Sequence, residues 1–333
     1  IDRLNDFRKA LSESTGIDLV LREKDEFGCN PCSEILLRDK QFCNLSEVII
    51  RENDTFETLT KKVQIATILG TIQSTLTDFK FLSKKWIKNT EDERLLGVSF
   101  TGIMDHEVMN GSKGNEILEK WLTDLRKVAI LTNAEWAKKL GIPMATAISC
   151  VKPSGTVSQL TDTASGIHAR HNPYYLRTVR SDKKDPLAKL MIDSGFYYEE
   201  DKMRPDHNWV FYFPQKAPKN AVYRNDKTAI EQLELWKTYQ IFWAEHKPSV
   251  TISVKENEWM SVGAWVFENF EYMSGVSFLP SFDHIYEQAP YIDITEEEYY
   301  TWLEKTPKDI DWEKLSAYET TDMSEGSQTL ACV

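Results

Sequence analysis

The residue types best suited to chemistry gather near the start of the chain, in the stretch FGCNPCSEILLRDKQFCNLSEV that runs from residue 27 to 48. It holds Cys29, Cys32 and Cys43, and a carboxylate, Glu34, follows the second cysteine by two residues. In an extended loop, residues two apart share one face. A carboxylate beside a sulfur disfavours the thiolate. The pair therefore suits a neutral thiol that transfers a hydrogen atom while the carboxylate takes a proton from the same substrate.

Other interpretations of this stretch stay open at the level of the residues. Cys29 and Cys32 could form half of a zinc site, but a second ligand pair is missing, since the remaining cysteines are scattered. A thioredoxin-like redox pair would need a preceding βαβ unit, which the sequence does not predict. Cysteines are also common as small buried hydrophobes. Polar neighbours such as Asn30, Ser33 and Asn44 would then need buried partners.

The elements that must position these residues follow from apolar spacing and capping signals. Helices are predicted over 2–14, 55–76, 115–140, 185–195, 229–246 and 258–273. Strands are predicted over 95–105 (a strand or turn), 144–151, 208–214, 248–254 and 275–280, with a long polar loop over 152–173. This alternation predicts an α/β fold with a parallel sheet and crossover helices. In such folds the chemistry lies on loops at the carboxyl ends of the strands.

Length, composition and charge exclude some classes of protein. The chain has 333 residues, which suits one large domain or two ordinary ones. Its formal net charge of −12 disfavours binding to the phosphate backbone of a nucleic acid. No apolar run of about 18 residues predicts a membrane span, and no secretory signal is visible. Five cysteines are too few for a disulfide scaffold, so a cytoplasmic location is expected. Because residue 1 is Ile, we expect a fragment, a processed product or one half of a split protein.

Several motifs together resemble the catalytic subunit of ribonucleotide reductases. NPCSEI followed by CNLSEV resembles the finger-loop motif of that family, and KPSGTVSQL resembles its substrate-phosphate loop. RLLGVSFTGIMD and GVSFLPSFDHIYEQAPY resemble stretches of the monomeric, adenosylcobalamin-dependent branch. The similarity covers nearly the whole chain in order. One departure is Ser33, which stands where the family usually has glycine and would be strained if the backbone there needs a positive φ.

The resemblance implies a fold: the second half of a ten-stranded α/β barrel over 1–317, with a central finger loop at about 27–46 that carries the radical cysteine. It places a phosphate loop at about 152–160. Residues 318–333 would be a mobile redox tail, which we expect to be truncated because the shuttle partner of Cys332 is absent.

The resemblance also implies roles for single residues. Cys32 would hold a transient thiyl radical and abstract the 3′ hydrogen of the ribose. Glu34 would deprotonate the 3′ hydroxyl, and Asn30 would hydrogen-bond the ribose hydroxyls. Cys43 would be one of two cysteines that become a disulfide, and Cys332 would relay electrons from thioredoxin or a similar reductant. The substrate phosphates would be wrapped by Pro153, Ser154, Gly155, Thr156, Val157 and Ser158.

The expected activity is the reduction of ribonucleotides, with triphosphates as the first choice, and with adenosylcobalamin as the cofactor. The second reducible cysteine and the allosteric region lie upstream in the family, so an N-terminal half or companion chain is expected. The alternatives are a diiron-subunit-dependent diphosphate reductase and a non-catalytic zinc or interaction module. No metal ligands are assigned, and His168 and His171 are expected to contact substrate, cofactor or neighbouring backbone.

Overall fold

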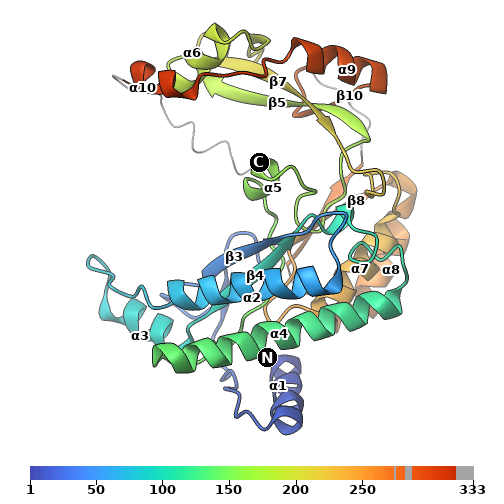
Figure 1. The fold of residues 1–333 in the computed structure, drawn as a ribbon. Helices are drawn as coiled ribbons and strands as arrows, with labels where there is room; N and C mark the ends of the chain where they lie inside the picture. The colour runs from blue at the N-terminus through green and yellow to red at the C-terminus, as the bar shows by residue number, and fades with distance from the viewer. Residues whose placement is uncertain (274, 282–286, 320–333) are drawn as a thin grey trace. The chain divides into compact units, whose positions relative to one another are not determined.

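The computed structural model of the chain describes residues 1–273, 275–281 and 287–319, and it divides into two compact units. The first unit contains Ile1–Ala169 and Asn220–Ser281, and the second contains Arg170–Lys219 together with the described residues 287–319. Helices and strands are mixed in both units (Figure 1). The predicted α/β class is therefore confirmed.

The first unit contains the Cys32 stretch and the loop that starts at Lys152. Its helices are α1 (Asp2–Thr15), α2 (Phe56–Gln73), α3 (Lys84–Glu93), α4 (Asn115–Leu140), α5 (Val157–Leu160), α7 (Ala229–Phe242) and α8 (Trp259–Glu268). Its strands are β1 (Gly28–Cys29), β2 (Leu36–Leu37), β3 (Asn44–Ile49), β4 (Leu96–Thr101), β8 (Val250–Val254) and β9 (Val276–Pro280).

Parallel strand segments follow one another through the first unit. β3 pairs with β4, and β8 pairs with β9, both in parallel. Between these pairs lies the segment predicted as a strand over 144–151, which forms only the isolated parallel bridges Val98–Ser149 and Val151–Pro248. The bridges connect β4 to this segment and the segment to the residues just before β8. The predicted parallel arrangement is thus confirmed in this unit.

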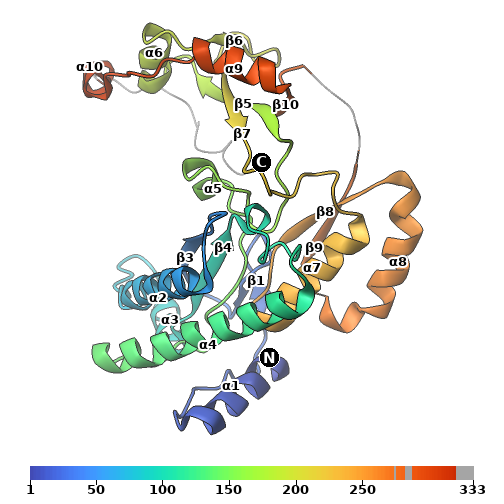
Figure 2. The ribbon, with the colours of Figure 1, turned by 45° about the vertical axis from the view of Figure 1, so that its right-hand side comes forward.

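Helices cover these strands, and their ends follow the expected signals. α2 and α4 run side by side along β3 and β4 in both views (Figures 1 and 2). Thr55 starts α2 with a capping box, in which its hydroxyl accepts from the backbone N–H of Thr58. Gly141 ends α4 in the left-handed conformation, which a residue without a Cβ adopts without strain. α4 therefore spans the predicted range.

The main core of the molecule lies between these helices and strands. Leu59 and Val63 of α2, Leu122 and Leu125 of α4, and Phe100 of β4 are all fully buried in one cluster. Burying a large apolar side chain contributes about 1.5–3 kcal/mol, so this cluster fixes the strands on which the site residues are carried.

The second unit is built differently, on a four-stranded sheet in the order β10–β5–β7–β6. Its elements are β5 (Tyr174–Asp182), α6 (Pro186–Asp193), β6 (Tyr198–Glu200), β7 (Asn208–Lys216), β10 (Tyr291–Asp293), α9 (Glu296–Lys305) and α10 (Leu315–Tyr318). All its strand pairs are antiparallel, so the predicted parallel sheet is wrong here. Side chains alternate along β7: Phe211 packs in the cluster that contains Ala188 of α6, and Val210 in the cluster that Trp302 of α9 contacts. Such alternation does not distinguish the two strand directions.

None of the described helices combines the length and the apolar character that crossing a membrane requires.

Candidate functional site

The predicted radical cysteine lies in the turn of a short hairpin. β1 and β2 pair antiparallel, and residues 30–35 connect them. The backbone N–H of Ser33 donates to the Asn30 carbonyl at 2.9 Å, and the N–H of Ile35 donates to Asn30 Oδ1 at 3.0 Å. Asn30 therefore stabilises the turn with both backbone and side chain. Cys32 is exposed in this turn, and its neighbour Cys29 is exposed as well.

Ser33 occupies the left-handed region, with a φ of 61°. The strain expected if this position needs a positive φ is therefore present, at roughly 1–2 kcal/mol for an L-residue. The turn also packs tightly, because a Cβ on Gly275, the residue before β9, would lie 2.1 Å from Ser33 Cβ. Only glycine fits at position 275 with the hairpin in this place. Sequence reasoning missed this contact, since nothing local links the two positions.

The carboxylate of Glu34 is buried, whereas Cys32, two residues earlier, is exposed. The Glu34 side chain is 0% exposed, and its Oε1 lies 2.6 Å from Nζ of Lys152. The Glu34 carbonyl also accepts from the backbone N–H of Lys247 at 2.9 Å. A buried carboxylate is stable only beside a cation or several donors, so Lys152 is the group that makes this burial possible. Lys152 was not among the predicted site residues, although it is the first residue of the predicted phosphate loop.

Cys43 lies half-buried just before β3, against Leu4, Leu95 and Ala147. Burial raises the pKa of the Cys43 thiol, although the nearby charges of Arg22 and Lys152 act in the opposite direction. The thiol is thus kept protonated.

The remaining described cysteine, Cys150, is buried, and burial also raises the pKa of its thiol, with Cys43 and Glu34 adding to the effect. Among the described residues, Cys29, Cys32, Cys43 and Cys150 form no disulfide. Cys332 lies outside the described residues.

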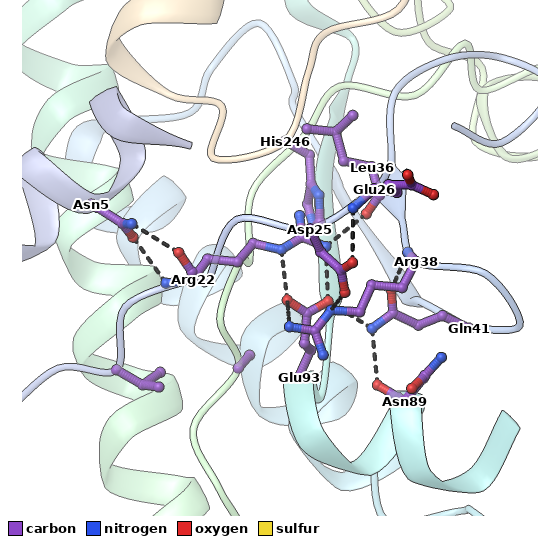
Figure 3. A network of polar contacts seen from close by, with 12 residues as sticks. Asn5, Arg22, Asp25, Glu26, Leu36, Arg38, Gln41, Asn89, Glu93 and His246 are labelled. Carbon is purple, nitrogen blue, oxygen red and sulfur yellow. Dashed lines mark hydrogen bonds and ion pairs between the residues drawn. The ribbon is translucent and has the colours of Figure 1, made fainter. Parts of the chain in front are cut away.

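A buried polar network anchors the hairpin to the end of α3 (Figure 3). Arg22 binds both carboxylate oxygens of Glu93, at 2.8 and 2.9 Å, and also donates to the Leu36 carbonyl of β2. Gln41 donates to Glu93 at 2.7 Å, and Arg38 lies 3.6 Å from the same carboxylate. The chain on both sides of the hairpin is therefore tied to one carboxylate. None of these residues was predicted.

His246 lies beside this network and donates from Nε2 to the Leu96 carbonyl at 2.9 Å. Burial lowers the pKa of His246 to about 3, and the charge of Arg22 adds to that shift. The ring is therefore neutral at physiological pH.

The first part of the loop that begins at Lys152, residues 153–163, is held mainly by hydroxyls of the loop itself, whereas Ala164 and Gly166 are hydrogen-bonded to Thr101 of β4. Ser154 has a φ of 58°, and its carbonyl accepts from the hydroxyls of Ser158 and Ser165. Ser158 is fully buried, whereas Gly155 and Thr156 are exposed. Among the predicted phosphate-binding residues, the Ser158 hydroxyl is therefore used in a hydrogen bond within the loop. Residues 155–157 are exposed, and a ligand can reach them.

Glu47 on β3 is a second carboxylate near this loop. Burial raises the pKa of Glu47, while the Ser154 hydroxyl and the charge of Lys152 act against that shift. The neighbouring strand β4 contributes Ser99, whose Oγ accepts from the backbone N–H of Lys152 at 2.8 Å. Polar groups of β3, β4 and the loop are thus gathered around Lys152.

The two histidines of the long loop have structural contacts. Nε2 of His168 accepts from the backbone N–H of Thr251 at 3.0 Å, so the proton is on Nδ1, which donates to the Ser165 carbonyl. Burial lowers the pKa of His168. The expected contact with neighbouring backbone is confirmed for this ring. His171 pairs with Asp293 at 2.6 Å in the second unit.

Within the described residues, no three or more His, Cys, Asp or Glu side chains come together as a metal site. A cavity of about 120 Å³ opens beside His168, between α7 and β8. Arg224 and Lys227 line it together with the polar side chains of Gln232 and Thr251. This lining suits a small anionic or polar group.

The fold and these motifs agree with known structures and sequences, although no family model matches the chain. The crystal structure of a B12-dependent (class II) ribonucleotide reductase superposes with a TM-score of 0.75 at 22% identity, covering 89% of this chain and 44% of that one. The α subunit of a class Id ribonucleotide reductase from Actinobacillus ureae gives a TM-score of 0.51 at 13% identity. The fold is therefore that of ribonucleotide reductase catalytic subunits.

The sequence comparison is more specific. The chain is 28% identical over 314 residues to the adenosylcobalamin-dependent ribonucleoside-triphosphate reductase of Euglena gracilis, covering 92% of this chain and 42% of that protein. It is 27% identical over 301 residues to the enzyme of the same name from Lactobacillus gasseri, covering 82% of this chain and 40% of that protein. The chain thus spans about two fifths of the length of these curated relatives. The resemblance to adenosylcobalamin-dependent ribonucleotide reductases is confirmed.

Proposed function

We propose that this chain carries the catalytic hairpin of a ribonucleotide reductase that acts on ribonucleoside triphosphates. One observation carries the proposal: Cys32 is exposed in a tight turn, while Glu34, two residues later, is buried and paired with Lys152. A reactive sulfur and a positioned carboxylate are the two groups that hydrogen-atom transfer with proton removal requires. The names of the relatives in the sequence comparison support the same activity.

The proposed reaction converts a ribonucleotide and a dithiol into a deoxyribonucleotide, a disulfide and water. Cys32, as a thiyl radical, takes the hydrogen atom from C3′ of the ribose, so an S–H bond forms and a carbon radical remains. Glu34 accepts the proton of the 3′ hydroxyl. The 2′ hydroxyl leaves as water with a proton from the thiols. Cys43 and a second cysteine become the disulfide: their second hydrogen goes to C2′, and their electrons reduce the sugar. Glu34 returns its proton to the 3′ oxygen, and Cys32 returns the hydrogen atom to C3′.

Substrate binding is assigned to the turn and to the loop. Asn30 would donate from its amide nitrogen to a ribose hydroxyl, since its Oδ1 already accepts from Ile35. The loop residues Pro153–Ser158 would bind the phosphates through the exposed backbone at Gly155 and Thr156. Backbone N–H groups and hydroxyls suit phosphate oxygens.

Adenosylcobalamin is the cofactor that we propose, because the relatives are named for their dependence on it. When bound, it supplies the radical that starts the reaction. The residue that would meet it is Cys32, since an exposed thiol can exchange a hydrogen atom with a cofactor bound outside the core.

The proposal also covers the barrel, the finger loop, the missing N-terminal half and the tail. Residues 1–317 would contribute the second half of a ten-stranded barrel, with 27–46 as its finger loop, and the parallel segments from β3 to β9 agree with this. An N-terminal half or companion chain would supply the second reducible cysteine. The tail 318–333, with Cys332, would pass electrons from thioredoxin or a similar reductant in the cytoplasm.

The test is an activity assay of the complete reductase that contains this chain, with a ribonucleoside triphosphate, adenosylcobalamin and a dithiol. Product formation should be lost in Cys32→Ser, and Glu34→Gln should lower kcat by about 10²–10⁴-fold. Cys29→Ser is the matched control, because Cys29 is an exposed cysteine of the same hairpin and has no assigned role. It should keep the wild-type rate.

The alternatives give different outcomes in this assay. A requirement for a diiron partner, or a preference for diphosphates, would contradict the cobalamin-dependent branch. Full activity in Cys32→Ser, or stoichiometric zinc on Cys29 and Cys32, would contradict the reductase itself. The comparisons do not favour either alternative.

A further inference from the structure

Lys152 holds the proposed catalytic carboxylate by one oxygen only. Its Nζ lies 2.6 Å from Oε1 of Glu34, whose side chain is 0% exposed, while the lysine side chain is 25% exposed. Oε2 of Glu34 is buried and has no hydrogen-bond partner among the described residues. A buried carboxylate oxygen without a donor is unfavourable unless a ligand supplies one. The second oxygen is therefore the atom to which a substrate hydroxyl can donate.

The backbone fixes the position from which the lysine reaches. The N–H of Lys152 donates to Ser99 Oγ on β4 at 2.8 Å, and the ring of the next residue, Pro153, restricts the chain. Gly166 packs against the Lys152 carbonyl so closely that a Cβ there would lie 2.3 Å from the carbonyl oxygen. Lys152 is thus a rigid connection between the start of the loop and the carboxylate of Glu34.

We propose that Lys152 is a positioning residue: it holds the Glu34 carboxylate through Oε1 and directs Oε2 at the substrate hydroxyl. This inference rests on the proposed function. In the step concerned, the O–H bond of the 3′ hydroxyl breaks and an Oε2–H bond forms, so a proton moves from substrate to Glu34 and no electron is transferred. Lys152 keeps its own proton throughout.

The charges around the pair agree with these roles. Burial lowers the pKa of Lys152, but the hydrogen bond and charge of Glu34 raise it overall, with smaller contributions from Cys150 and Cys32. Glu47, on β3, also faces the ammonium group. The lysine is therefore charged at neutral pH, and it is the nearest cation to the proposed base.

The test uses Lys152→Met and Lys152→Arg in the complete reductase. Without the ammonium group, the Glu34 carboxylate loses the cation that holds Oε1, so kcat at neutral pH should fall about 100-fold. This fold decrease in kcat should be larger than any fold increase in KM. Lys152→Arg retains the charge and should recover most of the rate. Lys152→Met added to Glu34→Gln should cause little further loss.

A matched control separates this role from a loss of stability. Lys62 forms an ion pair of the same length, 2.6 Å, with Asp54, whose side chain is 7% exposed. Lys62→Met should therefore lower stability and leave kcat near the wild-type value. A second readout does not depend on activity: the ¹³C chemical shift of the Glu34 carboxyl group, assigned with Glu34→Gln, should change in Lys152→Met and stay unchanged in Lys62→Met.

The two proposals fail in different ways. An active enzyme whose kcat and Glu34 carboxyl resonance are unchanged in Lys152→Met would overturn the role of Lys152 and leave the reductase proposal standing. An inactive wild-type enzyme would contradict the reductase proposal, and the carboxyl resonance would still decide whether Lys152 holds Glu34.

Discussion

The hairpin that carries Cys32 and the loop that begins at Lys152 are held in place by different forces. The hairpin depends on contacts from distant parts of the chain: the buried Arg22–Glu93 pair, the Glu34–Lys152 pair and the packing on Gly275. Beyond Lys152, residues 153–163 depend chiefly on hydroxyl groups of the loop itself. The turn that carries Cys32 is thus held by tertiary structure, whereas the proposed phosphate segment is held locally.

This difference predicts how strongly a single substitution destabilises each region. A hydrogen bond between neutral groups contributes about 0.5–1.5 kcal/mol, whereas removing one partner of a buried ion pair costs about 3–5 kcal/mol. Single substitutions should therefore damage the hairpin more than the loop.

The largest effect is expected for Arg22→Met. It leaves Glu93 buried without its bidentate partner, so the free energy of unfolding should fall by about 3–5 kcal/mol. Urea denaturation measures the loss, and hydrogen exchange of residues 27–43 should show it at the hairpin. Lys85→Met is the control, because the Lys85–Asp39 pair is exposed and should contribute less than about 1 kcal/mol.

A double-mutant cycle with Glu93→Met tests whether the loss of stability in Arg22→Met comes from the Arg22–Glu93 ion pair. The double variant Arg22→Met/Glu93→Met should lose less stability than the sum of the two single variants, since no unpaired buried charge remains. Additive losses would show that the pair itself does not hold the hairpin.

A smaller effect is expected for Gly275→Ala. The added Cβ would lie 2.1 Å from Ser33 Cβ, and such overpacking costs about 1–3 kcal/mol. Gly28→Ala is the matched control, because a Cβ at Gly28 meets nothing within 4 Å. Ser33→Gly should relieve the clash when it is combined with Gly275→Ala. Equal stability of Gly275→Ala and Gly28→Ala in thermal unfolding would refute the close packing of the turn.

The smallest effect is expected in the loop. Ser158→Ala removes the hydroxyl that donates to the Ser154 carbonyl, so stability should fall by about 1 kcal/mol. Thr161→Ala, which removes an exposed hydroxyl of the next turn, is the control. A loss in Ser158→Ala as large as that in Arg22→Met would contradict the proposed difference between the two regions.

Local signals in the sequence predicted the longer helices of the first unit (α1, α2, α4, α7 and α8) and three of its strands (β4, β8 and β9). The range of α4 was predicted because apolar spacing and Gly141 coincide, and that of α2 because Thr55 starts it. These features depend on neighbouring residues, which a single sequence displays. Helices α3 and α5 and strands β1–β3 were not predicted, and the strain at Ser33 was raised only as a condition, from the glycine usual in the family.

The supports of the site could not be predicted in the same way. Arg22 and Glu93 are 71 positions apart, and Glu34 and Lys152 are 118 apart. Nothing distinguishes such residues from exposed charges until the fold brings them together, because most charged side chains are exposed. The antiparallel pairing in the second unit was missed for a related reason. The alternation of side chains along β7 indicates that both faces of the strand are packed, but it does not indicate whether the neighbouring strands are parallel or antiparallel.

The contact between Gly275 and the Cys32 turn has a consequence for how the protein is made. During synthesis the hairpin leaves the ribosome well before Gly275, the residue against which its turn packs and which lies 242 positions after Ser33. Contacts between residues so distant in sequence form late, because a long loop must close first. Cys32, the proposed radical cysteine, would therefore reach its working geometry only when β9 docks, so a chain not yet translated as far as β9 does not present the assembled turn.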